Sequence, residues 1–564
     1  MFDFPPNAFD FRKTVDHMSY SSVPLIIKIW MIMKAKLILR RSGLFLLTTI
    51  TLMLLSPKWV FPAAAWFAPF LIILLIAPLK PWKAYLLAVL TLFGASLFSL
   101  YKVMPFPGIF FPIMTFVISL QSAIPYLVNR VLYPRIQHWT KTLVFPFALV
   151  IGEYLTSFGG GGSWSSISYT QVTNSFLIQA VSLGGIWLIA FVIGWFASLI
   201  FFLVEQRCYW QAVRTPAMGF SVLLIALTLF GFAKTNSFFD ARRNTVRVAG
   251  IATSHVPLLQ TMYEDTFGST VTVVEDDLTQ NSPELAELNK GFAAFVEDPY
   301  QDRFARTRTK LKECQDSLFN LSRKESAAGS QIISWSEAAV FTIKAEEGEL
   351  FKKGQIFAKD NNVYFLMTVA SIIPGKIEFG KKFIENKALL FDPEGNIVNV
   401  FFKNRPVPLV EPSIPGDGDI PVASTNYGKL AISICYDADF PQLMGQVGRK
   451  GADILLLPSG DWKEVSPYHA QMAIVRAIEN GTSLLRPVSG AVSIACDYHG
   501  NIIAQRSYFD DGERVVVAFL PVEGIRTLYS LVGDSFAWIC IAGLAGLLGL
   551  VVRRHASLFR SKGK

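Results

Sequence analysis

Residues 178–204 read IQAVSLGGIWLIAFVIGWFASLIFFLV, a run of 27 residues without a charged side chain. About 20 apolar residues in a helix cross the hydrocarbon core of a bilayer, so this stretch predicts a membrane-spanning helix. Six more apolar runs precede residue 234, and one lies near the C-terminus. The eight runs are approximately 43–56, 59–79, 83–103, 108–128, 141–158, 178–204, 216–233 and 534–552.

The composition of the whole chain agrees with a membrane protein. Of its 564 residues, 52% are hydrophobic and 17% are charged, against about 25% charged in ordinary soluble chains. The mean hydropathy of +0.39 excludes an intrinsically disordered protein and argues against a wholly soluble one. Five cysteines exclude a disulfide-rich scaffold, and none of them forms a CxxC pair that would indicate a zinc site.

Charge is distributed unevenly along the chain. Residues 1–233 carry a net charge of +11, residues 234–552 carry −7, and the last twelve residues add five basic side chains. A nucleic-acid-binding protein concentrates basic charge on a folded module, whereas here the basic residues flank apolar runs. We therefore expect no nucleic-acid partner.

The Lys/Arg bias of the short loops predicts the orientation. With the N-terminus inside, most basic residues fall in inner loops, and the short outer loops hold only Lys58 and Lys102. Seven spans then place residues 234–533 outside, and the eighth returns the C-terminus to the cytoplasm. The predicted parts are a cytoplasmic segment 1–42, a seven-helix membrane domain 43–233, an extracytoplasmic domain 245–525, an eighth transmembrane helix 534–552 and a basic tail 553–564.

The extracytoplasmic region shows short β-branched runs separated by turns and helical stretches. Helical patterns cover about 301–325 and 467–480, and the turns at 392–396 and 498–501 are typical of hairpin connections. Many strands with interspersed helices predict a layered α/β fold. The predicted strands are 245–251, 331–335, 363–369, 387–392, 398–403, 429–434, 453–457, 483–495 and 514–520.

Three ionisable residues each follow one of these strand-like runs: Glu337, Lys403 and Cys435. No GxSxG, HExxH or phosphate-binding glycine motif occurs, and the six histidines form no motif that suggests a base. Strand ends are where α/β folds present reactive groups. Each residue alone is weak evidence, because a cysteine at a strand end is commonly a small buried hydrophobe.

Glu153 lies inside the apolar run 141–158. A carboxylate within a membrane is costly and is a functional candidate by default. Alternatively, it sits near the outer end of its span and bonds a neighbouring helix. The loop that follows, Gly159–Trp164, either lines a route for lipid or is a simple connection.

Trp335-Ser336-Glu337, Phe402-Lys403-Asn404-Arg405 and Ile434-Cys435-Tyr436-Asp437 resemble the three signature segments of the nitrilase (carbon–nitrogen hydrolase) superfamily. The chain is more similar still to a membrane-bound branch of it, the apolipoprotein N-acyltransferases. That resemblance covers about residues 43–555. It includes the order of spans and domain, the surroundings of Glu153, and the segments Trp164–Gln171, Gln471–Ala477, Leu484–Arg486, Asp497–Gln505 and Thr527–Asp534.

Three departures from the family pattern concern substrate detail more than the nucleophile. Asp437 stands where the family usually has Glu. The segment Gly460-Asp461-Trp462 is shorter than the usual Asn-Asp-Ala-Trp-type loop. Pro487-Val488-Ser489-Gly490 replaces an Ala-Thr-Asn-type sequence.

The resemblance implies an αββα sandwich outside a bacterial cytoplasmic (inner) membrane, anchored on a multi-pass helical bundle. It implies transfer of a fatty acyl chain from a phospholipid to the N-terminal amine of a diacylglyceryl-cysteine lipoprotein, with no metal or organic cofactor. Cys435 is then the nucleophile that forms a thioester. Glu337 is the acid and base, and Lys403 lowers the thiol pKa and stabilises the oxyanion.

Several residues are implied in supporting roles. Glu411 matches a second acid of the family that orients Lys403 or the base, and Tyr436 and Asp437 flank the nucleophile. Glu153, Trp164 and Trp462 are candidates for lining the substrate or lipid. Two other functions stay open: a membrane-tethered amidase or nitrilase that hydrolyses a small amide, and a transporter or receptor with a non-catalytic nitrilase-like domain. The oligomeric state is open as well.

Overall fold

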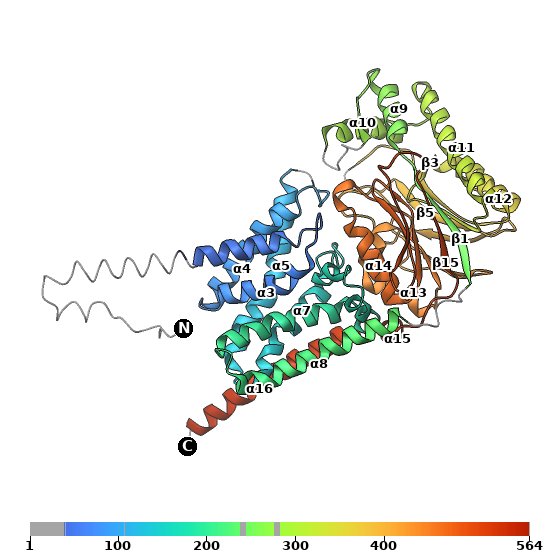
Figure 1. Ribbon diagram of the computed structural model, residues 1–564. Helices are drawn as coiled ribbons and strands as arrows, with labels where there is room; N and C mark the ends of the chain where they lie inside the picture. Colours follow the sequence, from blue (N-terminus) through green and yellow to red (C-terminus); the bar gives the residue numbers. More distant parts are fainter. Residues whose placement is uncertain are drawn as a thin grey trace, which may run out of the picture.

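The computed structural model describes residues 39, 41–106, 108–236, 244–275, 282–378 and 380–562 (Figure 1). The predicted cytoplasmic segment 1–42 lies outside the described residues except for positions 39, 41 and 42. In Figure 1 a group of packed helices lies beside a layered sandwich of sheets and helices.

A helix occupies each of the eight predicted apolar runs. Five of them, among the described residues, are long and apolar enough to cross a membrane, whereas the helices Arg41–Met53, α3 and α6 have fewer than 18 residues. The number of spans therefore stays a prediction. The labelled helices are α3 (Pro62–Ile76), α4 (Pro81–Ser99), α5 (Phe110–Leu132), α6 (Val144–Thr156), α7 (Val181–Glu205), α8 (Trp210–Thr235) and α16 (Ser535–Lys562).

Contacts between helix ends sort the loops into two groups that match the predicted sides. At one end, Lys141 pairs with Glu205 at 2.7 Å, and Arg554 donates to Gln137 at 2.6 Å. These residues belong to loops predicted to be cytoplasmic. The loops predicted to lie outside contact the sandwich instead, as described below.

Two sheets form the centre of the sandwich. The first has the order β15-β1-β2-β4-β5-β6, with β3 paired to β4, and the second has the order β14-β13-β11-β9-β8-β7. Their strands are β1 (Thr245–Ile251), β2 (Ile332–Trp335), β3 (Val340–Ile343), β4 (Tyr364–Ile372), β5 (Ile384–Phe391), β6 (Ile397–Phe402), β7 (Val422–Thr425), β8 (Gly428–Ile432), β9 (Ile454–Leu456), β11 (Ser483–Arg486), β13 (Val492–Cys496), β14 (Ile502–Ser507) and β15 (Val515–Pro521).

Apolar side chains of both sheets interdigitate, as Val248, Leu366, Ile432 and Leu456 do in one buried cluster. Helices α11 (Ala305–Ala327) and α12 (Glu347–Asn361) cover the outer face of the first sheet. Helices α13 (Pro441–Arg449) and α14 (Tyr468–Asn480) cover the second sheet on the side that faces the membrane helices. The domain is therefore an αββα sandwich, which confirms the predicted fold class.

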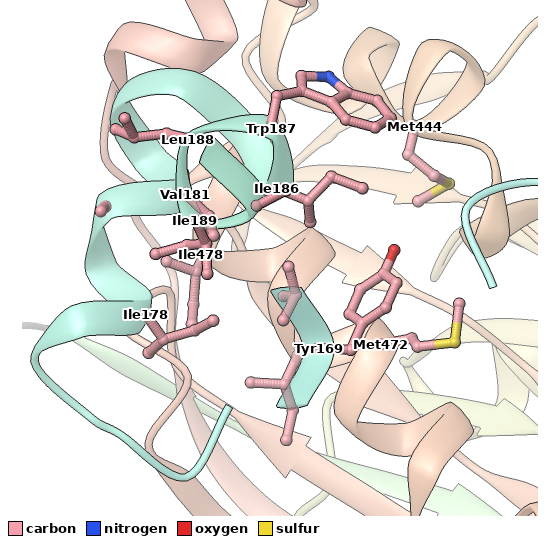
Figure 2. Close-up of a cluster of buried hydrophobic side chains, with 14 of the residues drawn as sticks. Tyr169, Ile178, Val181, Ile186, Trp187, Leu188, Ile189, Met444, Met472 and Ile478 are labelled. Atoms are coloured by element: carbon pink, nitrogen blue, oxygen red, sulfur yellow. The ribbon is translucent and has the colours of Figure 1, made fainter. Parts of the chain in front are cut away.

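The sandwich and the membrane helices share a hydrophobic core. Figure 2 shows Ile178 of the membrane part beside Ile478 of α14, and Trp187 of α7 beside Met444 of α13, with Met472 of α14 in the same cluster. All five side chains are buried. Because burial of such side chains stabilises by about 1.5–3 kcal/mol each, this shared core fixes the sandwich on the bundle.

Helix α7 is broken inside this core. Gly185 has φ +65°, and a Cβ there would lie 2.6 Å from the ring of Tyr529. The backbone N–H of Ile186, freed by the break, donates to Glu479 of α14 at 2.8 Å. The sandwich thus caps a helix of the membrane part.

The predicted strands are confirmed with shifts of a few residues at their ends, with one exception. The single run predicted at 483–495 is β11, the two-residue β12 (Val488–Ser489) and β13, because the chain turns at Pro487 and at Gly490, which has φ +79°. Strands β3, β7 and β14 were not predicted, and neither were α12, α13 and the helices α9 (Val256–Phe267) and α10 (Pro283–Glu297).

Candidate active site

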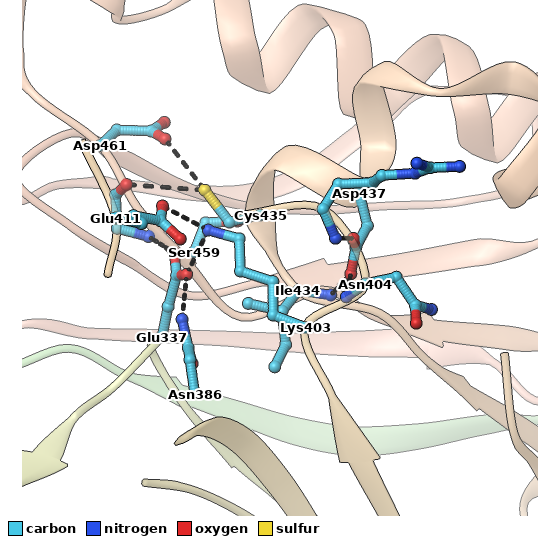
Figure 3. Close-up of polar contacts among 12 residues, drawn as sticks. Glu337, Asn386, Lys403, Asn404, Glu411, Ile434, Cys435, Asp437, Ser459 and Asp461 are labelled. Carbon is cyan, nitrogen blue, oxygen red and sulfur yellow. Dashed lines mark hydrogen bonds and ion pairs between the residues drawn. The ribbon is translucent and has the colours of Figure 1, made fainter. Parts of the chain in front are cut away.

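Glu337, Lys403 and Cys435 follow β2, β6 and β8, and the fold brings all three to one end of the sandwich (Figure 3). Lys403 Nζ lies 2.7 Å from Glu337 Oε1. The exposed fractions are 7% for Glu337, 0% for Lys403 and 3% for Cys435. Charged groups are almost never fully buried unless they are paired, so this convergence of a carboxylate, an ammonium and a thiol from three strands marks a functional site.

Each carboxylate oxygen of Glu337 is held by a donor. Oε1 accepts from Lys403 and from Asn386 Nδ2, each at 2.7 Å, and Oε2 accepts from the backbone N–H of Gly460 at 2.8 Å. These bonds fix the orientation of the carboxylate, as a general base requires.

Lys403 lies between two acids, because Glu411 Oε1 is 2.6 Å from its Nζ. Burial alone would lower the pKa of Lys403, but Glu337 and Glu411 outweigh burial and raise that pKa well above its ordinary value. Lys403 is therefore a fixed positive charge. Glu411 orients this lysine, which is one of the two roles expected of it.

Cys435 lies on a sharp turn between β8 and the 3₁₀ helix Cys435–Asp439. Its φ is +48°, in the left-handed region that costs a side-chain-bearing residue roughly 1–2 kcal/mol. Its backbone N–H donates to Pro458 O at 3.0 Å, and its Sγ lies 3.6 Å from Gly460 O. Strain of this kind concentrates at functional sites, and here it directs the thiol toward the two other residues.

Lys403 lowers the pKa of the Cys435 thiol, as expected, but other groups outweigh it and the thiol is neutral in this arrangement. Burial, Glu337 and Asp461 together raise the pKa of Cys435 well above its ordinary value, although Lys403 acts to lower it. Reaction therefore needs a base to remove the proton as the thiol attacks. The acceptors next to Sγ are Gly460 O and Asp461 Oδ1, and Glu337 is close enough for its charge to act on the thiol.

The carboxylate of Asp437 holds the turn at Cys435 in place through hydrogen bonds. It accepts from the backbone N–H groups of Ile434 at 3.1 Å, Arg405 at 2.7 Å and Asn404 at 3.4 Å. Burial raises the pKa of Asp437 to about 7, even though Lys403 and the backbone donors act to lower it. Asp437 thus connects the turn of Cys435 to the segment after Lys403 by hydrogen bonds.

A second charged group lies on another side of the sulfur. Asp461 Oδ1 is 3.9 Å from Cys435 Sγ and 2.7 Å from His469 Nδ1, and its Oδ2 accepts from Arg486 at 2.8 Å. His469 Nε2 lies 3.1 Å from Asp439 Oδ1. Burial alone would lower the pKa of His469, but Asp461 and Asp439 outweigh it and raise that pKa to about 9.

Cys435, Asp461 and His469 present a sulfur, an oxygen and a nitrogen within 4.8 Å of one another, which is close enough for a metal ion. A metal ligand must be deprotonated, however, and the carboxylates of Asp461 and Asp439 on either side of His469 raise its pKa to about 9, so the imidazole keeps its protons. The guanidinium of Arg486 also lies 3.0 Å from His469 Nδ1. This donor set therefore does not fit a metal site.

Loops of the membrane part cover the nucleophile. Tyr436 Oη donates to Gly160 O at 2.5 Å, and the backbone N–H of Ser163 donates to Asp439 O at 2.7 Å. Trp462 Nε1 donates to the carbonyl oxygens of Lys102 at 3.2 Å and Val103 at 3.1 Å. We call residues 102–103 and 159–164 the roof of the site.

Trp164 belongs to the roof and Glu153 lies just before it, and the bonds and ring contacts of these two side chains go to residues other than Glu337, Lys403 and Cys435. Glu153 accepts from Ser166 Oγ at 2.7 Å and from the N–H of Ile167 at 3.1 Å, so it fastens its own following loop. The Trp164 ring packs against Tyr468 and His469, with centroids 5.3 and 5.9 Å apart. Glu153 lies one turn before the end of α6, and its carboxylate bonds the N-terminus of the short 3₁₀ helix Ile167–Gln171 in place of another membrane helix.

The sequence did not predict that four residues contact the reactive groups or each other in this site: Asn386, Asp439, Asp461 and His469. Asn386 lies inside β5 and reaches Glu337 only through the pairing of β4 with β5. The spacing of Asp461 and His469 follows no general motif, because a loop and the first turn of α14 bring them together. A buried histidine between two acids becomes recognisable only in three dimensions.

Comparison with known proteins divides the chain into two matches. Residues 42–199 match the family profile described as apolipoprotein N-acyltransferase N-terminal domain. Residues 309–529 match the profile described as carbon-nitrogen hydrolase. The two matches correspond to the membrane helices and to most of the sandwich.

Curated relatives span both parts. The apolipoprotein N-acyltransferase of Geobacter metallireducens is 25% identical over 481 residues, which is 80% of this chain and 81% of that protein. Apolipoprotein N-acyltransferase 1 of Treponema denticola is 25% identical over 478 residues, 76% of this chain and 81% of that protein. A formamidase of Bacillus cereus is 32% identical over 143 residues, 25% of this chain and 41% of that protein. Among solved structures, an amidase from Nesterenkonia sp. matches with a TM-score of 0.34 and 16% identity, covering 50% of this chain and 92% of its own.

Proposed function

The chain belongs to the apolipoprotein N-acyltransferases, the membrane-bound branch of the carbon–nitrogen hydrolase superfamily, and we propose that it N-acylates lipoproteins through a thioester on Cys435. The acyl donor is a phospholipid, and the acceptor is the N-terminal amine of a diacylglyceryl-cysteine. Glu337, Lys403 and Cys435 carry the chemistry.

One observation carries this proposal: the nucleophile lies under a roof that the membrane part provides. Tyr436 and Trp462, which flank the site, bond to backbone carbonyls of loops 159–164 and 102–103. These loops adjoin the membrane helices, so a substrate that enters between them and the sandwich comes from the membrane. Lipid substrates arrive there by lateral diffusion, whereas a soluble amide needs no such arrangement.

In the first half-reaction, the thiol attacks the ester carbonyl of the phospholipid. A C–S bond forms while the thiol proton passes to Glu337. Lys403 donates to two carboxylates, and an ammonium has three protons, so one N–H is left for the tetrahedral oxyanion. The oxyanion then collapses, the C–O bond breaks, and the lysophospholipid leaves with the proton of Glu337.

In the second half-reaction, the acceptor amine attacks the thioester. An amide C–N bond forms, Glu337 takes a proton from the amine, and the C–S bond breaks. The departing sulfur recovers its proton from Glu337, which restores the neutral thiol. Across both steps an ester and an amine give an amide and an alcohol, and no cofactor takes part.

The proposal places the sandwich outside the inner membrane of a bacterium. The Lys/Arg distribution supports this side, and the grouping of the helix ends agrees with the parity of the predicted loops. On that side the site adjoins the outer leaflet of the inner membrane. Both proposed substrates carry acyl chains that anchor them in this leaflet.

The test is to incubate the purified protein with phospholipid alone. We expect a hydroxylamine-sensitive acyl group on Cys435, detected by mass spectrometry, that is discharged by a diacylglyceryl peptide with a free N-terminus. A peptide whose amine is blocked should leave the acyl group in place. Rapid release of free fatty acid without an acceptor, or turnover of a soluble amide instead, would favour the hydrolase alternative.

The matched control is Cys435→Ser. An alcohol of much higher pKa cannot be activated by the same neighbours, so we expect no acyl-enzyme and no turnover at normal membrane expression. Near-normal activity in this variant would mean that another residue is the nucleophile.

A further inference from the structure

Asp461 is the charged group within contact distance of the nucleophilic sulfur, yet the proposed chemistry does not use it. Its Oδ1 lies 3.9 Å from Cys435 Sγ, and its side chain is 2% exposed. In Figure 3 it approaches the sulfur from a different side than Glu337 and Lys403. A buried carboxylate is costly, so its presence beside the nucleophile calls for a function.

The bonds of Asp461 show what it offers to a ligand. An ionised carboxylate has about four acceptor positions. His469 occupies one on Oδ1 and Arg486 one on Oδ2, and the thiol of Cys435 faces Oδ1. When Cys435 becomes a thioester, the thiol proton is gone and this face of Oδ1 loses its donor. The carboxylate then presents a vacant acceptor position beside the acyl group.

We propose that this position receives the α-ammonium group of the acceptor, so that Asp461 docks the amine beside the thioester. The inference rests on the proposed function and extends it to the recognition of the second substrate. An amine in position to attack lies about 3–3.5 Å from the carbonyl carbon attached to the sulfur. A carboxylate oxygen 3.9 Å from that sulfur is within reach of it. Water carries no charge and gains nothing comparable from Asp461.

Asp461 is suited to binding a cation and poorly suited to removing its proton. Burial alone would raise the pKa of Asp461, but Arg486 and His469 outweigh burial and hold that pKa well below its ordinary value. The ammonium therefore loses two protons on its way to the amide: the first is released to solvent and frees the amine to attack, and the second passes to Glu337 and from there to the departing sulfur. Asp439 lies beyond His469, at 3.1 Å from its Nε2, and completes the charged groups on this side.

On the other side of the sulfur the charges also favour a cation. Lys403 is paired with both Glu337 and Glu411, so these three groups carry one net negative charge when both acids are ionised; burial raises the pKa of Glu411 against the attraction of Lys403. One oxygen of Glu411 is buried without a hydrogen-bond partner. On the side of Asp461, the two acids Asp461 and Asp439 are balanced by Arg486 and His469, so the attraction there comes from the vacant acceptor position on Oδ1 and not from a net charge.

The experiment compares two nucleophiles on the same acyl-enzyme. Asp461→Asn is acylated with phospholipid, and discharge by a diacylglyceryl peptide is measured against discharge by hydroxylamine, which is uncharged at neutral pH. Because a hydrogen bond to a charged group is lost, we expect the ratio of peptide to hydroxylamine rates to fall about tenfold or more relative to wild type. The exposed replacement Asp316→Asn is the matched control. An unchanged ratio would overturn the inference.

If Asp461→Asn does not fold, the pH dependence of the acceptor KM of the wild-type protein tests the same inference. The acceptor must bind as the ammonium form, so its KM should rise about tenfold per pH unit above the amine pKa near 8. A KM that is flat or falls across this range would refute ammonium docking. Failure of the wild-type protein to form or discharge an acyl-enzyme would instead refute the proposed function.

Discussion

Replacing His469 by Gln should remove a pH-dependent part of the stability of the sandwich. His469 is buried between Asp461 at 2.7 Å and Asp439 at 3.1 Å, and its pKa rises from 6.5 to about 9 in the folded protein. A difference of this size corresponds to about 3 kcal/mol in favour of the folded state. The glutamine side chain keeps a polar group in this space but carries no charge at any pH.

The direction in which stability changes with pH follows from proton binding by His469. Above the unfolded pKa near 6.5, the folded protein still binds the proton and the unfolded chain does not, so stability falls as pH rises. The contribution is fully present below about pH 6.5 and is lost above about pH 9. Acids with raised pKa values, such as Asp437 and Glu479 at about 7, have completed most of their titration before the upper half of this window.

The assay is thermal unfolding of wild type and His469→Gln in the same detergent from pH 6 to pH 10. For a domain of this size, about 3 kcal/mol corresponds to roughly 6–12 °C in Tm. We expect the wild-type Tm to fall by about this amount between pH 7 and pH 9.5, and the variant to show a much flatter profile. Equal slopes for the two proteins would refute the assignment of a charged His469.

Two further predictions test the orientation and the roof. A cysteine-accessibility probe placed at exposed Asn320 should react from outside the cytoplasmic membrane, and labelling only after permeabilisation would overturn the proposed orientation. Gly162→Ala should reduce acyl transfer strongly, because Gly162 has φ +53° and the added Cβ would lie 2.5 Å from Asp439 O. Gly161→Ala, whose Cβ meets nothing within 4 Å, is its matched control, and equal activities of the two variants would contradict a role for the roof.

The sequence predicted the elements whose signal is local. Apolar runs located all eight hydrophobic helices, and β-branched runs located the central strands such as β1, β4 and β8. The three reactive residues were found because each follows such a run. The two edge strands of the second sheet were not predicted because their patterns are weak: neither β7 nor β14 has a fully buried residue.

What the sequence could not predict depends on long-range contacts. The partners of Asp461 come from α14 and β11, and those of Glu337 from β5 and the loop after β9. The net rise of the Cys435 pKa was not predicted for the same reason. A lysine near the thiol was inferred, but the burial and the second carboxylate that outweigh it were not visible in the pattern.

A neutral thiol under a roof suits transfer better than hydrolysis. Burial raises the pKa of Cys435, so activation must wait until a substrate brings an ester to Glu337 and Lys403. The same burial, with Cys435 only 3% exposed, keeps water away from the thioester once it has formed. Slower activation of the nucleophile is therefore coupled to a longer-lived intermediate. A hydrolase does not benefit from a long-lived thioester. An acyltransferase needs the thioester to survive until its second lipid substrate arrives.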